Sequence, residues 1–305
     1  MLSDVRNSRW SAWGSYFISA AVHHGFGRYQ RDRIAFGARD YKGQCPPREC
    51  SMTLIMVAPN GARRTRQDHA QIPVTDDELV QTANACFEAG ASALHAHIRT
   101  ADQTHLLNAA RYQQLIHKMN QIVPDMRIQV TSEAAGIYAS DQQIALLETL
   151  EAPWVSLSIR EVCRDQSDDR LTSFFRALCA RTRVQFIVYD LDDFSNLIEL
   201  KRREMIPNIE LEVLYVLGRY AQGQQSNPRD LEPFIEFREQ LPPSDRPSHE
   251  MVCAFGISQI ECLTHAAHAG LDLRIGFENG IWLPDGEIAS DNASLVRALV
   301  DALAT

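Results

Sequence analysis

The sequence predicts an α/β fold, a (β/α)8 TIM barrel with an N-terminal extension. From Met52 onward, short apolar runs rich in β-branched residues alternate eight times with amphipathic stretches of helical length. This part of the chain has roughly the 250 residues typical of one such barrel. The apolar runs are nearly continuous, as expected for strands packed on both faces. Eight repeats of this kind predict a closed parallel barrel.

Each expected strand is followed by an expected helix. The strands are predicted at 53–58, 91–98, 127–131, 154–159, 184–190, 211–217, 250–255 and 271–277. A side chain able to accept a hydrogen bond from the free N–H groups of a first turn marks each expected helix start. These starts are near Thr75, Asn108, Ser140, Asp168, Asp192, Asn227, Ser258 and Asn292. Functional residues are then expected at the C-terminal ends of the strands.

Residues 1–51 differ from the remainder in charge and pattern. They contain eight Lys and Arg against four Asp and Glu, so this segment is +4 and the rest of the chain, which totals −9, is −13. No period of 3.6 or 2 is sustained in it. We therefore expect residues 1–51 to form a loosely ordered extension and residues 52–305 the barrel domain. A start codon assigned too far upstream, or a regulatory or oligomer-contacting arm, are the alternatives.

Composition argues against two classes of partner. The net charge of −9 comes without a basic block, so nucleic acid is not an expected ligand. No apolar run approaches the roughly 20 residues that span a bilayer, and the N-terminus lacks a secretory pattern. The sequence thus predicts a cytoplasmic enzyme acting on small molecules, without membrane partners.

The second expected strand carries a possible half of a metal site. His95 and His97 are two residues apart, so on a strand their side chains point to one face, while Ala96 points to the other. Two neutral imidazoles directed into the barrel near its C-terminal mouth are typical zinc ligands. A pair of hydrogen-bonded core histidines is an equally good interpretation of this motif alone.

The eighth expected strand ends in a carboxylate that favours the metal interpretation. In a closed barrel, strands two and eight both flank strand one, so Glu278 can approach both histidines. A set of two histidines and one carboxylate with an open position is typical of catalytic zinc. Arg274, four residues earlier, would be a buried cation that requires a carboxylate or an anionic substrate. An ordinary loop acid is the alternative for Glu278.

Six segments in this order resemble the β-keto acid cleavage enzymes, a group that includes the 3-keto-5-aminohexanoate cleavage enzyme. They are residues 58–62 (APNGA), 95–99 (HAHIR), 129–136 (QVTSEAAG), 155–161 (VSLSIRE), 216–220 (VLGRY) and 274–279 (RIGFEN). The resemblance extends over about residues 52–303. It implies a Zn²⁺ cofactor, acetyl-CoA as co-substrate and a homotetramer. The implied reaction condenses a β-keto acid with acetyl-CoA and yields acetoacetate and a new acyl-CoA.

The resemblance also implies catalytic residues, with one departure. Arg274 matches the arginine of a family arginine–aspartate pair that removes a proton from the substrate. The aspartate position holds Asn279, and an amide cannot act as a general base. Glu133 and Glu261 are carboxylates near strand ends that would substitute. Alternatively, the departure marks altered chemistry or an idle barrel that binds CoA esters or another protein.

Substrate contacts are expected at other strand ends. Thr131 matches a hydroxyl residue that helps to hold the substrate, and Ser132 is its competitor. Relatives that handle an aminated keto acid carry an acid where this chain has Arg63 and Arg64. Arginines there favour an anionic or neutral substrate tail, or the phosphates of CoA. Arg219 is a further expected contact.

An amidohydrolase-type zinc hydrolase is the enzymatic alternative, because such barrels also use a His-x-His pair. Those enzymes place the pair on the first strand and add later histidines, whereas here the pair lies on the second expected strand and the fifth and sixth strands end without histidine.

Overall fold

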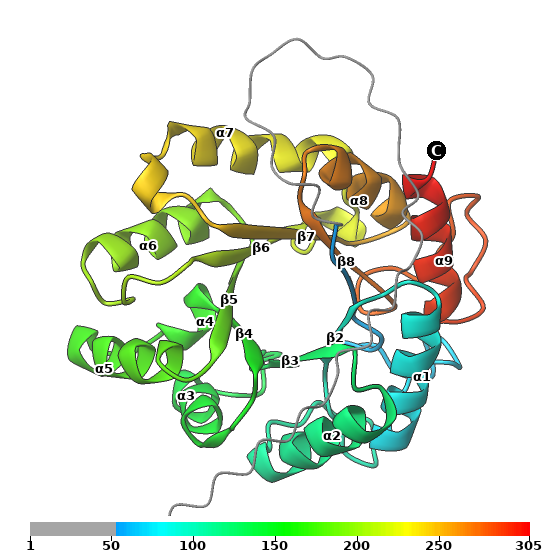
Figure 1. The fold of residues 1–305 in the computed structure, drawn as a ribbon, viewed down its shortest axis with the longest axis horizontal. Helices are drawn as coiled ribbons and strands as arrows, with labels where there is room; N and C mark the ends of the chain where they lie inside the picture. Colours follow the sequence, from blue (N-terminus) through cyan, green and yellow to red (C-terminus); the bar gives the residue numbers. More distant parts are fainter. Residues whose placement is uncertain (1–52) are drawn as a thin grey trace, which may run out of the picture. The chain divides into compact units, whose positions relative to one another are not determined.

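The computed structural model describes residues 53–305, so the expected extension at 1–51 lies outside the described residues. Eight parallel strands form a closed ring in chain order, and β1 also pairs with β8. Figure 1 shows this ring with helices around its outside. The strands are β1 (Ile55–Val57), β2 (Ala93–Ala96), β3 (Arg127–Thr131), β4 (Trp154–Ser158), β5 (Arg183–Val188), β6 (Glu212–Leu217), β7 (His249–Ala254) and β8 (Asp272–Ile275). The predicted TIM barrel is confirmed.

Helices follow every strand within this part of the chain. They are α1 (Asp76–Glu88), α2 (Ala109–Ile122), α3 (Ser140–Thr149), α4 (Ile159–Val162), α5 (Asp168–Cys179), α6 (Leu191–Arg202), α7 (Glu232–Gln240), α8 (Gln259–His268) and α9 (Asn292–Leu303). Short 3-10 helices are η1 (Gln222–Gln224), η2 (Pro228–Leu231) and η3 (Pro243–Asp245). Of the helices in residues 53–305, none combines the length and apolar character needed to cross a membrane.

Helix starts follow the expected capping chemistry in most places. Thr75 and Asn108 accept hydrogen bonds from the backbone of the first turns of α1 and α2. Ser140 was expected to cap α3, and this is wrong, because its hydroxyl donates to the Val162 carbonyl, 2.5 Å away. Ser258 precedes α8 without a side-chain cap. At three helices the cap lies one or two residues before the expected position: Ser167, Asp190 and Asp291.

Most expected strands were too long by one or two residues at one or both ends. The third was correct, and the fifth and seventh begin one residue earlier than expected. Residues beyond these ends, such as Ile98 and Phe277, remain fully buried although they lie outside the strand ladder. The hydrophobic pattern reports burial, and some loop residues that follow the strands are as buried as the strand residues themselves. For this reason the pattern overestimates strand length there.

Alternation along the strands divides the apolar residues between two cores. Met56 and Ala93 belong to the cluster inside the barrel, with Leu214 and Met251. Leu94 belongs to the cluster between the barrel and its helices. Because Ala93 points inward, the period of two along β2 also directs the side chain of His95 inward. The fold therefore places this histidine in the barrel interior.

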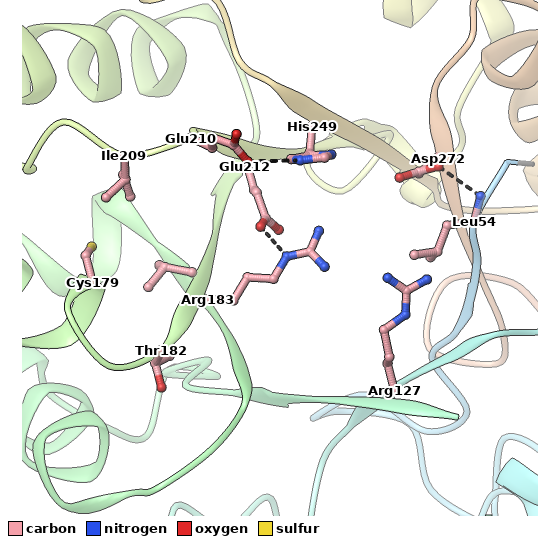
Figure 2. A pocket seen from close by; sticks show the side chains of 11 residues that line it. Leu54, Arg127, Cys179, Thr182, Arg183, Ile209, Glu210, Glu212, His249 and Asp272 are labelled. Carbon is pink, nitrogen blue, oxygen red and sulfur yellow. Dashed lines mark hydrogen bonds and ion pairs between the residues drawn. The ribbon is translucent and has the colours of Figure 1, made fainter. Parts of the chain in front are cut away.

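The N-terminal end of the barrel holds a charged cavity of about 580 Å³ (Figure 2). Arg183 pairs with Glu212 there, and its guanidinium lies 4.4 Å from the centre of the Trp154 ring. Asp272 accepts a hydrogen bond of 2.9 Å from the backbone N–H of Leu54. These contacts tie together the starts of separate strands, which is the usual structural role of this end of a TIM barrel.

Candidate active site

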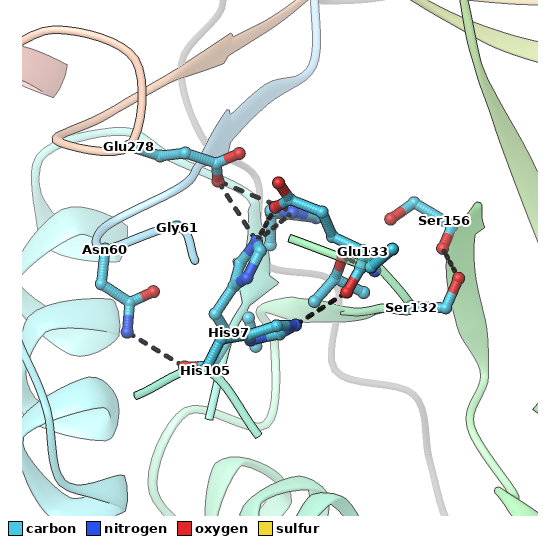
Figure 3. A network of polar contacts seen from close by, with 12 residues as sticks. Asn60, Gly61, His97, His105, Ser132, Glu133, Ser156 and Glu278 are labelled. Atoms are coloured by element: carbon cyan, nitrogen blue, oxygen red, sulfur yellow. Dashed lines mark hydrogen bonds and ion pairs between the residues drawn. The ribbon is translucent and has the colours of Figure 1, made fainter. Parts of the chain in front are cut away.

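Three predicted ligands converge at the C-terminal mouth. The Nε2 atoms of His95 and His97 are 3.0 Å apart. Oε2 of Glu278 lies 3.6 Å from Nε2 of His95 and 3.5 Å from Nε2 of His97. Figure 3 shows the carboxylate of Glu278 directed at the ring of His97. In residues 53–305, these three form the one group of His, Cys, Asp and Glu side chains with metal-binding spacing.

Two glycines make this convergence possible. The backbone N–H of Glu278 donates to the carbonyl of Ala58, 3.0 Å away, which fastens the end of β8 to the end of β1. Gly276 has φ +146°, and a Cβ there would lie 2.3 Å from the Ala58 carbonyl oxygen. Gly61 has φ +61°, and a Cβ there would lie 2.4 Å from Cγ of Glu278. Only glycine allows both close approaches.

The protonation state of His95 suits metal binding. Its Nδ1 lies 2.7 Å from Oε1 of Gln129, and an amide oxygen can only accept, so Nδ1 carries the proton. Nε2 then presents its lone pair to His97 and Glu278. Burial, with help from the nearby Arg274 guanidinium, lowers the pKa of His95 to about 4. The ring is therefore neutral at neutral pH, as a metal ligand must be.

Donor spacing fits a tetrahedral divalent ion. Metal–nitrogen bonds of about 2.0–2.1 Å in tetrahedral geometry separate the donors by about 3.3 Å. The three separations here, 3.0, 3.5 and 3.6 Å, bracket that value. Oε2 of Glu278 is buried and has no hydrogen-bond donor in residues 53–305. An acceptor in this situation is costly unless a cation satisfies it.

Arg274 lies beside the carboxylate of Glu278. Its Nη2 is 3.2 Å from Oε1 of Glu278 and 3.3 Å from Sγ of Cys253. Although burial opposes ionisation, the Arg274 guanidinium holds the pKa of Glu278 well below its usual range. Of the acids in the described chain, Glu278 is the one that pairs with Arg274.

Asn279 occupies a fully buried position, and its backbone is held in place. Its carbonyl accepts a hydrogen bond of 3.1 Å from the N–H of Gly256, and its N–H donates to the carbonyl of Gly276. Neither atom of the side-chain amide has a partner in residues 53–305. The amide therefore supplies no proton acceptor comparable to a carboxylate at this position.

Of the two substitute carboxylates, only Glu133 lies at the site. Its Oε2 is 3.9 Å from Nε2 of His97. Burial, Glu278 and Glu161 raise the pKa of Glu133 to about 7. Glu133 and Glu278 line a small cavity of about 50 Å³. Glu261 is exposed in the first turn of α8 and does not line it.

The two expected hydroxyls point in different directions. Thr131 ends β3, and its Oγ1 accepts a hydrogen bond of 3.0 Å from the backbone N–H of Glu133. Thr131 shares the inward strand face of Gln129. Ser132 donates its hydroxyl to the carbonyl of Ser156, 3.1 Å away (Figure 3). The structure thus brings Thr131 toward the site and turns Ser132 to the neighbouring strand.

The expected arginines gather at the cavity of Glu133. Arg63 and Arg64 reach it from the loop after β1, and Arg219 reaches it from the end of β6. The Arg219 guanidinium lies 5.3 Å from the centre of the Phe255 ring. Neither Arg63 nor Arg219 forms an ion pair within residues 53–305.

Two residues that support the site, Gln129 and Arg99, were not among the predicted site residues. Gln129 fixes the ring of His95, and it lies two residues before Thr131 on the same strand face, so strand periodicity could have indicated it. Arg99 donates through Nη2 to the carbonyls of Asn60 (3.2 Å) and Arg64 (2.9 Å), which ties the loop after β2 to the loop after β1. No local pattern signals that contact, because its partners are backbone atoms more than 30 residues away.

Structural comparison supports the fold. The structure of ObcA in complex with oxaloacetate superposes with a TM-score of 0.59 at 16% identity, covering 77% of this chain and 64% of that one. A type I 3-dehydroquinate dehydratase from Clostridium difficile superposes with a TM-score of 0.53 at 12% identity, covering 83% of this chain and 91% of that one. At these identities the likeness concerns the barrel alone.

Sequence comparison identifies the family. A 3-keto-5-aminohexanoate cleavage enzyme from Acetoanaerobium sticklandii is 25% identical over 255 residues, which cover 81% of this chain and 90% of the relative. A 3-oxoadipate:acetyl-CoA acetyltransferase from Cupriavidus necator is 30% identical over 79 residues, covering 26% and 28%. The profile of the beta-keto acid cleavage enzyme family matches residues 52–305. The chain belongs to the β-keto acid cleavage enzyme family.

Proposed function

We propose that this protein is a zinc-dependent enzyme that condenses a β-keto acid with acetyl-CoA and releases acetoacetate and a new acyl-CoA. The observation that carries the proposal is the convergence of His95, His97 and Glu278 on one point at the C-terminal mouth of the barrel. Family membership and the names of the two relatives support the reaction class. Zn²⁺ fits this donor set of two imidazoles and one carboxylate.

Of the three proposed ligands, Glu278 lines the cavity in which we expect the substrate to bind. When bound, Zn²⁺ supplies a Lewis acid that stabilises negative charge as it develops on a substrate oxygen. Gln129 keeps His95 in the tautomer that presents Nε2. Arg274 keeps Glu278 ionised and orients it through Oε1, so Oε2 remains free to bind the metal. The protein thus holds all three ligands ready before substrate enters.

We assign proton removal to Glu133. Asn279 cannot accept a proton, and Arg274 already pairs with Glu278. Glu133 lines the same cavity as Glu278 and lies 3.9 Å from the Nε2 of His97. A carboxylate in this position can take the proton from C2 of a β-keto acid whose oxygens face the histidines. The proton would remain on Glu133 while the carbanion attacks the thioester carbonyl and CoA moves to the keto carbon of the adduct. Carbon–carbon cleavage would then release the new acyl-CoA and the acetoacetate carbanion, which takes the proton back from Glu133.

Thr131 is the proposed hydroxyl contact for substrate. Because its Oγ1 accepts from the N–H of Glu133, its own hydrogen is free to be donated to a substrate oxygen. The hydroxyl of Ser132 donates to the carbonyl of Ser156 and is not available in this way. We therefore assign the contact to Thr131 alone.

Purified protein loaded with Zn²⁺ and offered a panel of β-keto acids with acetyl-CoA tests the proposal. Acetoacetate formation that is lost in His95→Ala and kept in His117→Ala, an exposed histidine on α2, is the expected result. The competing function is an idle barrel that binds CoA esters, and the buried amide of Asn279 favours it. Thioester binding without acetoacetate from any keto acid would select that alternative.

We also propose that the protein is a homotetramer, as the resemblance to the family implies. Light scattering of the purified protein measures its mass in solution, and a monomer would contradict this assignment.

A further inference from the structure

Arginines at the active-site cavity lack the acidic partner that Arg274 has in Glu278. Arg63, Arg64 and Arg219 line the cavity and make no ion pair within the part of the chain that the structure describes. Arg64 lies over the Trp282 ring, 5.9 Å from its centre. Arg63 follows β1 and Arg219 follows β6, so the fold brings cations from distant segments to one cavity.

The surroundings of Arg219 favour an anionic ligand. Its guanidinium is partly buried and lies over the aromatic faces of Phe255 at 5.3 Å and Tyr220 at 5.8 Å. Stacking of this kind fixes the plane of the guanidinium while leaving its N–H edge open. A planar carboxylate matches that edge with two parallel hydrogen bonds. An ammonium group would be repelled, and a neutral tail would leave the donors unpaired.

The proposed metal site, at His95, His97 and Glu278, can bind only one carboxylate of the substrate. Glu278 faces the histidines with one oxygen and Arg274 with the other, so the charges of Arg274 and Glu278 offset each other. Besides Glu278, Glu133 is the one acid of residues 53–305 that lines this cavity, so it offsets the charges of Arg63, Arg64 and Arg219 only in part. An anionic group at the other end of the substrate would complete the charge balance.

We propose, on the basis of the function assigned above, that the substrate is a β-keto dicarboxylate whose distal carboxylate binds between Arg63 and Arg219. The keto acid end then faces His95, His97 and Glu278. This assignment names a specificity site: the two arginines select the substrate without taking part in the bond changes.

The phosphates of CoA are another anion that these arginines could bind, and a truncated thioester separates the two cases. Acetylpantetheine carries the same acetyl thioester without the nucleotide and its phosphates. If the arginines bind the substrate carboxylate, Arg63→Met and Arg219→Met will leave the KM for acetyl-CoA unchanged. If they bind phosphate, both variants will raise the KM for acetyl-CoA and leave that for acetylpantetheine unchanged, which overturns the proposal.

The decisive experiment compares a β-keto dicarboxylate with its distal monomethyl ester, which keeps the shape and removes the charge. For the wild type we expect kcat/KM to favour the diacid by about ten- to a hundredfold, the range expected for hydrogen bonds to a charged group. Arg219→Met and Arg63→Met should each reduce this preference by lowering kcat/KM for the diacid more than for the ester. Arg176→Met, on the exposed face of α5, is the matched control and should behave as wild type.

Substrate binding measured without acetyl-CoA tests the specificity site independently of the proposed reaction. Calorimetric titration of the Zn²⁺-loaded protein with diacid and ester reports the preference even if no acetoacetate forms. Tighter binding of the diacid that weakens in Arg219→Met supports the specificity site, whatever the turnover. Equal binding and equal turnover of diacid and ester by the wild type would overturn it. Thermal unfolding of each variant verifies that it folds.

Discussion

One carboxylate oxygen of Glu278 faces Arg274, at 3.2 Å from Nη2, and the other faces the Nε2 atoms of His97 and His95, at 3.5 and 3.6 Å. Glu278 therefore has two roles, as counter-ion and as proposed ligand. Both side chains are nearly buried, so removing the carboxylate of Glu278 would leave Arg274 as a buried cation without a counter-ion.

Glu278→Gln is predicted to lower stability as well as metal binding. The amide leaves the buried Arg274 cation uncompensated, which costs about 3–5 kcal/mol in comparable pairs. Adding Arg274→Met to Glu278→Gln removes that cation. The double variant should recover much of the lost unfolding free energy, while its zinc binding stays weak. Denaturant unfolding of the single and double variants measures this. A double variant no more stable than Glu278→Gln would argue against the pairing.

Glu133→Gln is predicted to lower acetoacetate formation by about 10²–10⁴-fold, the usual contribution of a general base. Zinc content should remain that of the wild type, because Glu133 is not among the three converging ligands. Glu261→Gln removes a carboxylate of the same kind from the exposed face of α8 and is the matched control. Comparable kcat values for Glu133→Gln and the control would exclude Glu133 as the base.

Gly61→Ala is predicted to damage the metal site more than the fold. A methyl group at residue 61 would lie 2.4 Å from Cγ of Glu278, so the carboxylate must move away from the histidines. Gly136 also has positive φ, +80°, but a methyl group there meets nothing within 4 Å. Gly136→Ala thus reports the backbone strain alone, about 1–2 kcal/mol. Chelator competition for Zn²⁺ should show weakened binding only in Gly61→Ala; equal zinc affinity in both variants would contradict the close contact.

The capping box at α1 should make stability depend on pH below 5. Burial alone would raise the pKa of Glu78, but hydrogen bonds from the N–H groups of Thr75 and Val74, with the Arg66 guanidinium, lower it from 4.5 to about 2. A carboxyl with a lowered pKa in the folded state adds stability above pH 4.5, and this is lost as the pH falls toward 2. Glu78→Gln should therefore be less stable than wild type at pH 7, with the difference shrinking below pH 4.5. A difference that stays constant with pH would show that ionisation of Glu78 is not involved.

The barrel and the convergence of His95, His97 and Glu278 could be predicted from sequence because both follow from periodicity. A period of two along β2 directs His95 inward, and closure of the ring places β8 next to β1, so Glu278 can approach the histidines. These conclusions need no side-chain detail. Strand ends were less certain, since buried loop residues such as Phe277 continue the apolar pattern beyond the ladder.

Contacts that depend on rotamers and distant backbone atoms could not be predicted. Thr131 and Ser132 are adjacent hydroxyl residues, and only the structure shows that Ser132 donates to the Ser156 carbonyl. Glu133 and Glu261 both lie near strand ends, yet only Glu133 lines the cavity. The dual contact of Glu278 with Arg274 and the histidines also depends on three-dimensional packing.

Metal analysis of the purified protein after dialysis tests the central claim most directly. The account predicts one zinc per chain in the wild type and in the exposed-site variant His117→Ala, and none retained in a variant with both His95→Ala and His97→Ala. Stoichiometric zinc in that double variant, with the fold intact, would contradict the assignment of these side chains as the metal site.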